Sequence, residues 1–341
     1  MRIGLLTGGG DAPGLNGIIE AVWRTLQPHG HSLIGICDGF EGVFEGRTRN
    51  LTANDVGGIH AIAGTVLGTS NRVGTAGREA LFLERYRALE LDALIVAGGD
   101  GTFAGLRSLG ASLNLVGVPK TIDNDLSGTD RTFGWDTACA VVADAVDSLR
   151  TTAHAHRRVL VVETMGRYAG WIALGGGVAA MADAILIPER PYDAARLANF
   201  VKGRHSTQRS FIAVVAEGAR ATDHALHVAR SVEGSPDPVR LGGIGAFLAN
   251  WLEAETGWEA RHVVLGHLQR AHGPSPSDRR LTAALGVEAA MMAMEGAFDQ
   301  AAVMRQGLVA RVPISELMAP ARTVPSNEPL LQVALSLGIF V

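Results

Sequence analysis

Two acidic turns in the first half of the chain carry residues that could do chemistry. GGDGT (98–102) and TIDND (121–125) each follow an apolar run. Glycines let a backbone approach a phosphate closely, but a carboxylate beside a phosphate repels it unless a magnesium ion lies between them. Asp100 therefore indicates Mg²⁺ together with a nucleotide or pyrophosphate. Asp123 and Asp125 suit a general base and a group that orients or binds. Together the two turns predict phosphoryl transfer.

Each turn also has a purely structural explanation. GGDGT can be a strand-to-helix turn with an N-capping aspartate, and asparagine and aspartate are common turn residues. The pair at this spacing, with each turn following a strand, is much more specific than either turn alone. Ligands bind at such strand ends in open α/β sheets, so the functional interpretation is favoured.

Further candidate residues lie in other turns and loops. TGGGDAPGLN (7–16) holds four glycines in seven positions and lacks the GxGxxG spacing of dinucleotide folds, so it either caps the next helix or cradles a phosphate. Arg72 is either a solvated charge or a clamp on the transferring group. Arg167 could meet an anionic substrate, and His267 with Arg270 could form a second phosphate pocket. Ordinary surface or turn roles are the alternatives.

Alternating strands and helices would position these residues. Apolar runs predict strands at 2–6, 32–37, 115–118, 159–162, 184–187, 211–215 and 260–265, with another from Leu94 into the glycines of the first acidic turn. Helical periodicity predicts helices at 17–26 and 136–149. This order is typical of an α/β fold, in which the strand ends carry the site.

Composition narrows the class of protein. With 341 residues, of which 47% are hydrophobic, the chain can bury a large core and is expected to form two domains. A net charge of −4 argues against nucleic-acid binding. Cys37 and Cys139 have neither zinc nor disulfide spacing, no apolar run reaches about 18 residues, and the chain starts as a strand rather than a signal peptide. We therefore expect a cytoplasmic protein without a membrane partner.

The motifs occur in a recognisable order. TGGGDAPGLN, GGDGT, PKTIDND, MGRYAGW, AEG and LGHLQR follow one another along nearly the whole chain. In this order and spacing they resemble the phosphofructokinase A family, whereas NAD and diacylglycerol kinases are similar only at the GGDGT turn. The resemblance implies magnesium-assisted transfer of a phosphoryl group from ATP to the 1-hydroxyl of fructose 6-phosphate, giving fructose 1,6-bisphosphate in glycolysis.

The resemblance also implies the architecture. It predicts two Rossmann-like three-layer α/β/α domains with largely parallel sheets and the active site in the cleft between them. Residues 1–135 with about 269–303 would form the larger phosphoryl-donor-binding domain. Residues from about 136 to 268 with 304–341 would form the smaller fructose-6-phosphate-binding domain.

Roles carry over from the family residue by residue. Asp123 is expected to be the general base that takes the 1-hydroxyl proton, Thr121 and Asp125 to position sugar and magnesium, and Asp100 to hold the magnesium. Arg72 and Arg167 complete the catalytic set. The phosphoryl-donor positions are Gly9, Arg72, Asp100, Gly101, Thr102, Gly105 and Lys120. The sugar-phosphate positions are Thr121, Asp123, Asp125, Met165, Gly166, Arg167, Glu217, His267 and Arg270, joined by Arg158 and Arg261 from a neighbouring subunit, which implies a homotetramer or homodimer.

Several positions depart from the family pattern. The loop before Arg72 has one residue more than the family's LGSAR, and Phe40 replaces a tyrosine common beside the nucleotide. Glu20 stands where regulated bacterial members place an effector-binding arginine, although Arg24 and Arg150 remain. An acid there would repel an anionic effector, so we expect weak or absent control by ADP and phosphoenolpyruvate.

Two residues bear on the phosphoryl donor and point in different directions. In the pyrophosphate enzymes of the family the position of Gly101 is an aspartate, which occupies the space of the nucleotide α-phosphate and repels it. Lys120 matches the lysine of those same enzymes, yet a lysine is compatible with ATP. ATP is therefore the favoured donor, with pyrophosphate as the alternative. A non-catalytic nucleotide-binding relative should have lost Asp100, Asp123 or Asp125, and all three are present.

Overall fold

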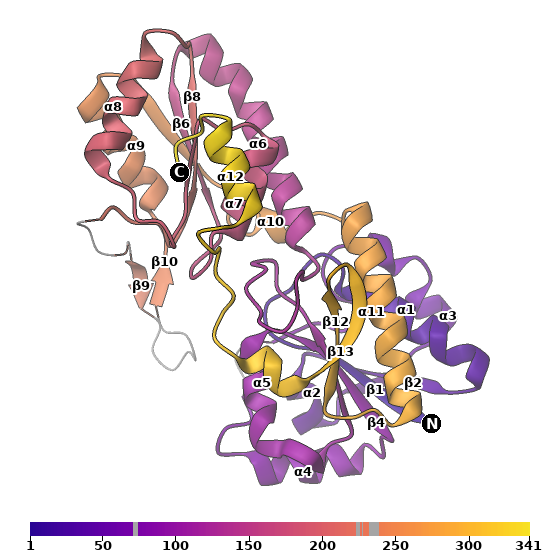
Figure 1. The fold of residues 1–341 in the computed structure, drawn as a ribbon. Coiled ribbons are helices and arrows are strands. Elements are labelled where there is room, and N and C mark those ends of the chain that lie inside the picture. Colours follow the sequence, from indigo (N-terminus) through magenta and orange to yellow (C-terminus); the bar gives the residue numbers. More distant parts are fainter. Residues whose placement is uncertain (71–73, 223–225, 227, 232–238) are drawn as a thin grey trace. The chain divides into compact units, whose positions relative to one another are not determined.

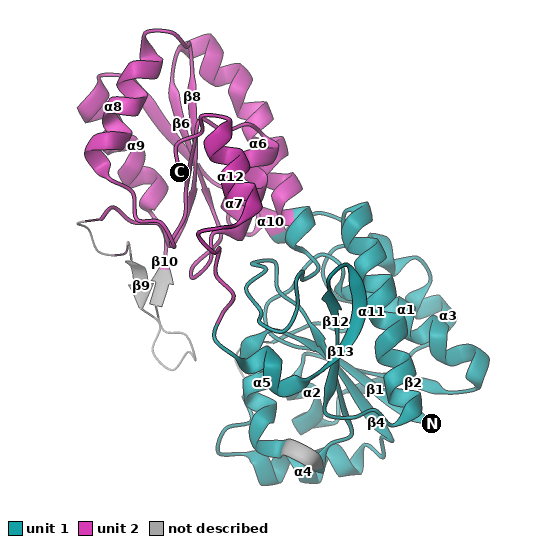
Figure 2. Cartoon of the chain, viewed as in Figure 1, with its two compact units in different colours: residues 1–137, 270–320 teal, residues 138–269, 321–341 magenta. Residues whose placement is uncertain are grey.

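A computed structural model describes residues 1–70, 74–222, 226, 228–231 and 239–341. The chain divides into two compact units (Figure 2). Unit 1 comprises Met1–Thr137 and Arg270–Pro320, and unit 2 comprises Ala138–Gln269 and Ala321–Val341. Each unit is built around its own sheet (Figure 1).

Unit 1 contains a seven-stranded sheet in the order β13-β12-β5-β4-β1-β2-β3. Its central strands are parallel, whereas β3 and β13 run antiparallel to their neighbours β2 and β12. The bounds are β1 Arg2–Thr7, β2 Ser32–Ile36, β3 Thr48–Asn50, β4 Ala93–Gly98, β5 Leu115–Pro119, β12 Gln300–Arg305 and β13 Leu308–Pro313. The apolar runs of β1, β4 and β5 are buried, as expected for strands covered on both faces.

Helices cover both faces of this sheet. Successive strand residues point to opposite faces, so Leu5 and Ile95 join one apolar cluster while Leu6 and Val96 join another. The first cluster is covered by α1 (Leu15–Leu26), α3 (Ala53–Val56) and α11 (Pro276–Glu295), and the second by α2 (Phe40–Glu45), α4 (Glu79–Ala88) and α5 (Asp100–Leu106) (Figure 1). Short 3₁₀ helices span Gln27–His29, Ile59–Ala61, Arg107–Ser112 and Ile314–Met318. Unit 1 is thus a three-layer α/β/α body.

Unit 2 contains a four-stranded parallel sheet in the order β11-β6-β8-β7. Its strands are β6 Val159–Thr164, β7 Ala184–Leu186, β8 Phe211–Ala216 and β11 Ala260–Val264. Helices α8 (Ala194–His205) and α9 (Ile244–Thr256) cover one face. On the other, α7 (Trp171–Ala179) packs on β7 and β8, with α6 (Trp135–His156) and α12 (Pro329–Ser336) against it (Figure 1). The remaining elements are β9 (Val228–Ser231), β10 (Val239–Leu241) and α10 (Leu268–Ala271).

The structure confirms the predicted α/β class with mostly parallel sheets. Residues 304–320, which the sequence assigns to the second domain, lie in unit 1. They complete β12 and form β13, and β12 pairs in parallel with β5 at Gln300 and Ala301. No helix within the described residues combines the length and apolar composition needed to cross a membrane.

Candidate active site

Strand pairing brings the two glycine-rich turns of unit 1 together. Because β1 pairs with β4, both turns leave the sheet at the same edge, and the Gly8 N–H donates to the Ala97 carbonyl at 2.9 Å. Both turns close on the buried side chain of Thr102, from which a Cβ on Gly8 or on Gly98 would lie only 2.7 or 2.5 Å. Only glycine fits such an approach. The glycine-rich turn at 7–16, predicted either to cap a helix or to cradle a phosphate, and GGDGT therefore pack directly against each other.

Two predicted donor-binding glycines of unit 1 differ in their surroundings. A Cβ on Gly101 would have no atom within 4 Å, so the space beside this residue is open. A Cβ on Gly105 would lie 3.3 Å from the Phe40 ring, and its carbonyl accepts a hydrogen bond from the Thr75 hydroxyl. Gly9 adopts a positive φ of 79°. Arg72 lies outside the described residues.

The second acidic turn is fastened to the end of β5. The Lys120 N–H donates to the Gly98 carbonyl at 2.9 Å, which ties this turn to GGDGT. Asn124 adopts a left-handed φ of 53°, and its side-chain oxygen accepts the Thr132 N–H at 2.9 Å. The Thr132 hydroxyl donates to the Thr121 carbonyl at 2.7 Å. These bonds hold the backbone on both sides of Asp123 in one geometry.

Asp125 lies close enough to two other acids of unit 1 for their charges to act on it. Burial, followed by the nearby charges of Asp123 and Asp100, raises the pKa of Asp125 to about 7. A bound cation would favour its ionised form. Within the described chain, no group of three or more His, Cys, Asp or Glu side chains could by itself hold a metal ion. This donor set suits Mg²⁺, which binds one or two carboxylates plus substrate phosphates.

Lys120 brings a buried positive charge to the same place. Its ammonium donates a hydrogen bond to the Gly10 carbonyl, and the residue is only 4% exposed. Burial, followed by the charge of Arg270, lowers the pKa of Lys120 to about 8, while Asp11, Asp100 and Asp123 act in the opposite direction. At neutral pH the lysine is therefore mainly protonated and can compensate an anionic ligand.

Arg270 lies in unit 1 against the first glycine-rich turn. Its guanidinium is 3.8 Å from the Asp11 carboxylate, and a Cβ on Gly10 would lie 2.6 Å from Nη1. Its buried Nε has no hydrogen-bond partner among the described residues. An unpaired guanidinium N–H beside a phosphate-type turn is a donor suited to an anion. The predicted sugar-phosphate residue thus lies next to the predicted donor turn.

The strand ends of unit 2 gather the other predicted sugar-phosphate residues. Met165, Gly166 and Arg167 follow β6, and the Glu217 N–H after β8 donates to the Thr164 carbonyl at 2.9 Å. The Gly218 N–H donates to the Gly166 carbonyl at 3.1 Å, which joins the turn after β8 to the turn after β6. Exposed His267 follows β11, whose end is joined to β6 because the Leu265 N–H donates to the Glu163 carbonyl at 3.0 Å.

Arg158 and Arg261 lie at the opposite edge of this sheet. They stand at the amino ends of β6 and β11, so they do not join Met165 and Glu217 within unit 2. Arg158 pairs with Glu259 at 2.7 Å, and Arg261 pairs with Glu259 at 2.5 Å. Partly exposed ion pairs of this kind contribute little, so both guanidiniums could turn to another anion.

Three contacts of unit 1 were not predicted from the sequence. Thr132 braces the turn around Asp123, Asp11 faces Arg270, and Thr75 holds Gly105 against Phe40. A threonine in a polar loop gives no local signal of such a role. Only the Asp11 position lay within a motif that the sequence singles out.

Glu20 on α1 is satisfied within its own unit. The buried carboxylate pairs with Arg24 at 2.7 Å and accepts the His60 N–H at 2.9 Å, and the His60 ring Nδ1 lies 2.8 Å from it. Burial alone would raise the pKa of Glu20, but the hydrogen bonds from His60 and Arg24 hold it at about 2. Glu20 is therefore a fixed negative charge that engages the nearby cation Arg24.

Known proteins are similar to this chain over nearly its whole length. ATP-dependent 6-phosphofructokinase 2 of Streptomyces coelicolor is 45% identical over 96% of this chain and 97% of that protein. The pyrophosphate--fructose 6-phosphate 1-phosphotransferase of the same organism is 44% identical over 95% of this chain and 96% of that protein. A crystal structure of Pichia pastoris phosphofructokinase in the T-state has a TM-score of 0.81 at 29% identity over 98% of this chain, which spans 36% of that longer chain.

The family assignment follows from these likenesses. The sequence model of the family described as Phosphofructokinase matches residues 2–293. The resemblance predicted from the motifs is thereby confirmed. The chain belongs to the phosphofructokinase family.

Proposed function

We propose that this protein is an ATP-dependent 6-phosphofructokinase, which transfers a phosphoryl group from ATP to the 1-hydroxyl of fructose 6-phosphate. The observation that carries the proposal is the clustering of Asp100, Asp123 and Asp125 beside two fused glycine-rich turns. Family membership limits the reaction class, and this cluster supplies the chemistry. A non-catalytic relative would not need three mutually repelling acids at one strand edge.

Within this proposal the acids divide the work. Asp123 takes the 1-hydroxyl proton as the hydroxyl oxygen attacks the terminal phosphorus of ATP, and ADP leaves. Mg²⁺ would be held by Asp100 and Asp125 with the phosphates and would neutralise their charge. Lys120 stabilises the donor phosphates, and the backbone around Gly9, Gly101 and Thr102 approaches them. Positioning and charge stabilisation dominate, because phosphoryl transfer asks little covalent chemistry of the protein.

Unit 2 would bind the sugar phosphate. Met165, Gly166, Arg167, Glu217 and His267 share one strand edge, where arginine recognises phosphate and glutamate accepts sugar hydroxyls. Arg270 of unit 1 would supply a further guanidinium for a phosphate, and Arg72 would act on the transferring group. Asp123 and Asp125 orient the reacting hydroxyl. The enzyme would work in the cytoplasm as part of glycolysis.

A direct assay tests the proposed activity. Purified protein is supplied with fructose 6-phosphate, Mg²⁺ and either ATP or pyrophosphate, and kcat/KM is compared for the two donors. We expect a clear preference for ATP and loss of turnover when Mg²⁺ is chelated. A preference for pyrophosphate would replace the proposed donor with the alternative, and no turnover with either donor would refute the assigned reaction.

We also propose a homo-oligomer, in which Arg158 and Arg261 complete a neighbour's sugar-phosphate site. Their position at the sheet edge away from Met165 and Glu217 supports this role. Light scattering should give the mass of a tetramer or dimer. Replacing both arginines by alanine should raise the KM for fructose 6-phosphate with little change in KM for ATP. A fully active monomer would exclude this role.

Effector control is expected to be weak or absent. Glu20 already engages Arg24, and Arg150 donates to the carbonyls of Ala180 and Met181. Both arginines are therefore already engaged within the protein, and the buried Glu20 charge repels an anionic effector. Fructose 6-phosphate titrations should therefore be hyperbolic, and neither ADP nor phosphoenolpyruvate should change them through a site at Glu20, Arg24 and Arg150. Strong sigmoidality that ADP relieves would contradict this expectation.

A further inference from the structure

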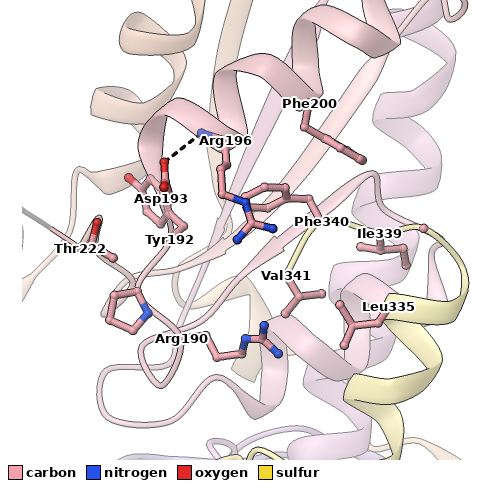
Figure 3. A pocket seen from close by; sticks show the side chains of 12 residues that line it. Arg190, Tyr192, Asp193, Arg196, Phe200, Thr222, Leu335, Ile339, Phe340 and Val341 are labelled. Carbon is pink, nitrogen blue, oxygen red and sulfur yellow. Dashed lines mark hydrogen bonds between the residues drawn. The ribbon is translucent and has the colours of Figure 1, made fainter.

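A cavity of about 440 Å³ lies wholly within unit 2, apart from every residue assigned above. Figure 3 shows its two sides, one from the segment after β7 with α8 and one from the end of the chain. Its volume lies in the range of small-molecule sites, which is about 300–1,000 Å³. It is lined by Arg190, Pro191, Tyr192, Asp193, Arg196, Phe200, Thr222, Leu335, Gly338, Ile339, Phe340 and Val341.

Two cations stand on one side of this cavity. The exposed side chains of Arg190 and Arg196 extend toward its centre (Figure 3). Among the described residues, no carboxylate lies within ion-pair distance of either guanidinium, whereas Arg47, Arg158 and Arg311 are all paired. Asp193 also lines this side, and its carboxylate accepts the backbone N–H of Arg196 at 2.9 Å. Because the two guanidiniums outnumber this single carboxylate, they form a binding place for a phosphate group.

The opposite side is apolar and fixed by backbone pairing. Phe340 lies beside β7, since the Ile185 N–H donates to its carbonyl at 2.8 Å and its own N–H donates to the Asp183 carbonyl at 3.0 Å. Phe340 and Leu335 line this side. The ring of Phe200, which lies on α8 with Arg196, contacts it with a centroid distance of 5.5 Å to Phe340, so the apolar wall is largely preformed. A ligand that fits both sides carries a phosphate at one end and an aromatic or apolar group at the other.

The cavity is connected to the turn that precedes α7. Glu189, next to Arg190, accepts the Gly170 N–H at 3.0 Å and the Val324 N–H at 2.8 Å. Gly170 is the last residue of the turn between β6 and α7, and this turn contains Met165 and Arg167. Movement of the Arg190 segment would therefore be transmitted through Glu189 to the expected sugar-phosphate turn, which is the coupling that allosteric control requires.

We propose that this cavity binds an organic phosphate monoester with an aromatic or apolar group, and that its occupancy changes the affinity for fructose 6-phosphate. The second half of the proposal rests on the proposed function. The first half does not, because it depends only on the charge and shape of the cavity.

The binding half can be tested with 1-naphthyl phosphate as a fluorescent probe. The full-length protein is titrated with this probe, with 1-naphthol, which lacks the phosphate, and with inorganic phosphate, which lacks the ring. The double variant R190Q/R196Q should bind the probe at least about tenfold more weakly, because both phosphate contacts are lost. The exposed Arg209, outside the cavity, provides the matched control R209Q, which should bind like the wild type.

Two results would overturn the binding site. One is unchanged probe affinity in R190Q/R196Q while melting temperature and circular dichroism show a folded protein. The other is displacement of the probe by fructose 6-phosphate in direct competition, which would place the probe in the active site. Equal affinity for 1-naphthol would likewise remove the role of the phosphate.

The coupling half has a kinetic readout. A saturating concentration of the probe should shift the KM for fructose 6-phosphate in wild type and R209Q but not in R190Q/R196Q. Arginine-dependent binding without any KM shift would support the site and overturn its coupling. Failure of the kinase assay itself would refute the proposed function and leave the binding result standing, so the two failures are distinguishable.

Discussion

Replacement of Asp123 by asparagine should lower kcat by about 10²–10⁴-fold, the usual contribution of a general acid or base. Asparagine keeps the size of the side chain, and the backbone N–H of residue 123 still donates to the Thr121 hydroxyl. It cannot accept the 1-hydroxyl proton, however. Steady-state kinetics should show the loss in kcat, while calorimetry should show that fructose 6-phosphate still binds.

The control for this variant is an aspartate of the same kind outside the site. Asp147 is exposed on α6, so Asp147→Asn should leave kcat and KM close to the wild-type values. Removing the Asp123 charge also removes one cause of the raised pKa of Asp125, so the variant should not be less stable for electrostatic reasons. A folded Asp123→Asn enzyme with undiminished kcat would show that another group is the base.

Local sequence patterns were sufficient to predict the two acidic turns. An apolar strand that breaks into glycines leaves little choice of structure, and β4 and β5 end next to GGDGT and TIDND. Parallel pairing then determines which turns meet, because neighbouring parallel strands end at one edge. Residues 7–16 could therefore be expected beside GGDGT, and the contacts of Gly8 and Gly98 with Thr102 show them there.

Other features depend on contacts between distant segments. Strands β12 and β13 follow a helix and mix apolar with polar or charged residues such as Gln300, Arg305 and Arg311. The sequence therefore contains no clear apolar run that would predict them. Their place is decided by pairing of β12 with β5 and of β13 with β12, which no local pattern contains. The hydrogen bond from the Thr132 hydroxyl to the Thr121 carbonyl likewise joins residues that no local pattern connects.

The cavity of unit 2 could not be predicted for a related reason. Its walls come from the segment around Arg190 and from the end of the chain near Phe340. Neither segment contains a recognisable motif, and their neighbourhood arises from the bridge between Ala184 and Phe340. Sites of this kind are visible only after the strand order is known.

The donor is expected to depend on the side chain at position 101. The space beside Gly101 is open, since a Cβ there would meet no atom within 4 Å. An aspartate would extend into that space with a negative charge, where the α-phosphate of ATP is proposed to lie. Pyrophosphate has no third phosphate and no nucleoside, so the same side chain should obstruct it much less.

Gly101→Asp should therefore lower kcat/KM for ATP by about 10²-fold, as expected when like charges meet in a partly desolvated site. The matched control is Gly101→Ala: the residue is helical, an alanine favours that backbone, and its methyl group enters empty space, so ATP turnover should stay near wild type. Both variants are assayed with ATP and with pyrophosphate at saturating fructose 6-phosphate. Equal losses with the two donors would mean that the aspartate damages the site in general, whereas an unchanged ATP rate would show that Gly101 does not adjoin the α-phosphate. A loss confined to ATP and absent in Gly101→Ala would establish that an open position 101 is what admits the nucleotide, even though Lys120 supplies the positive charge that a pyrophosphate enzyme uses.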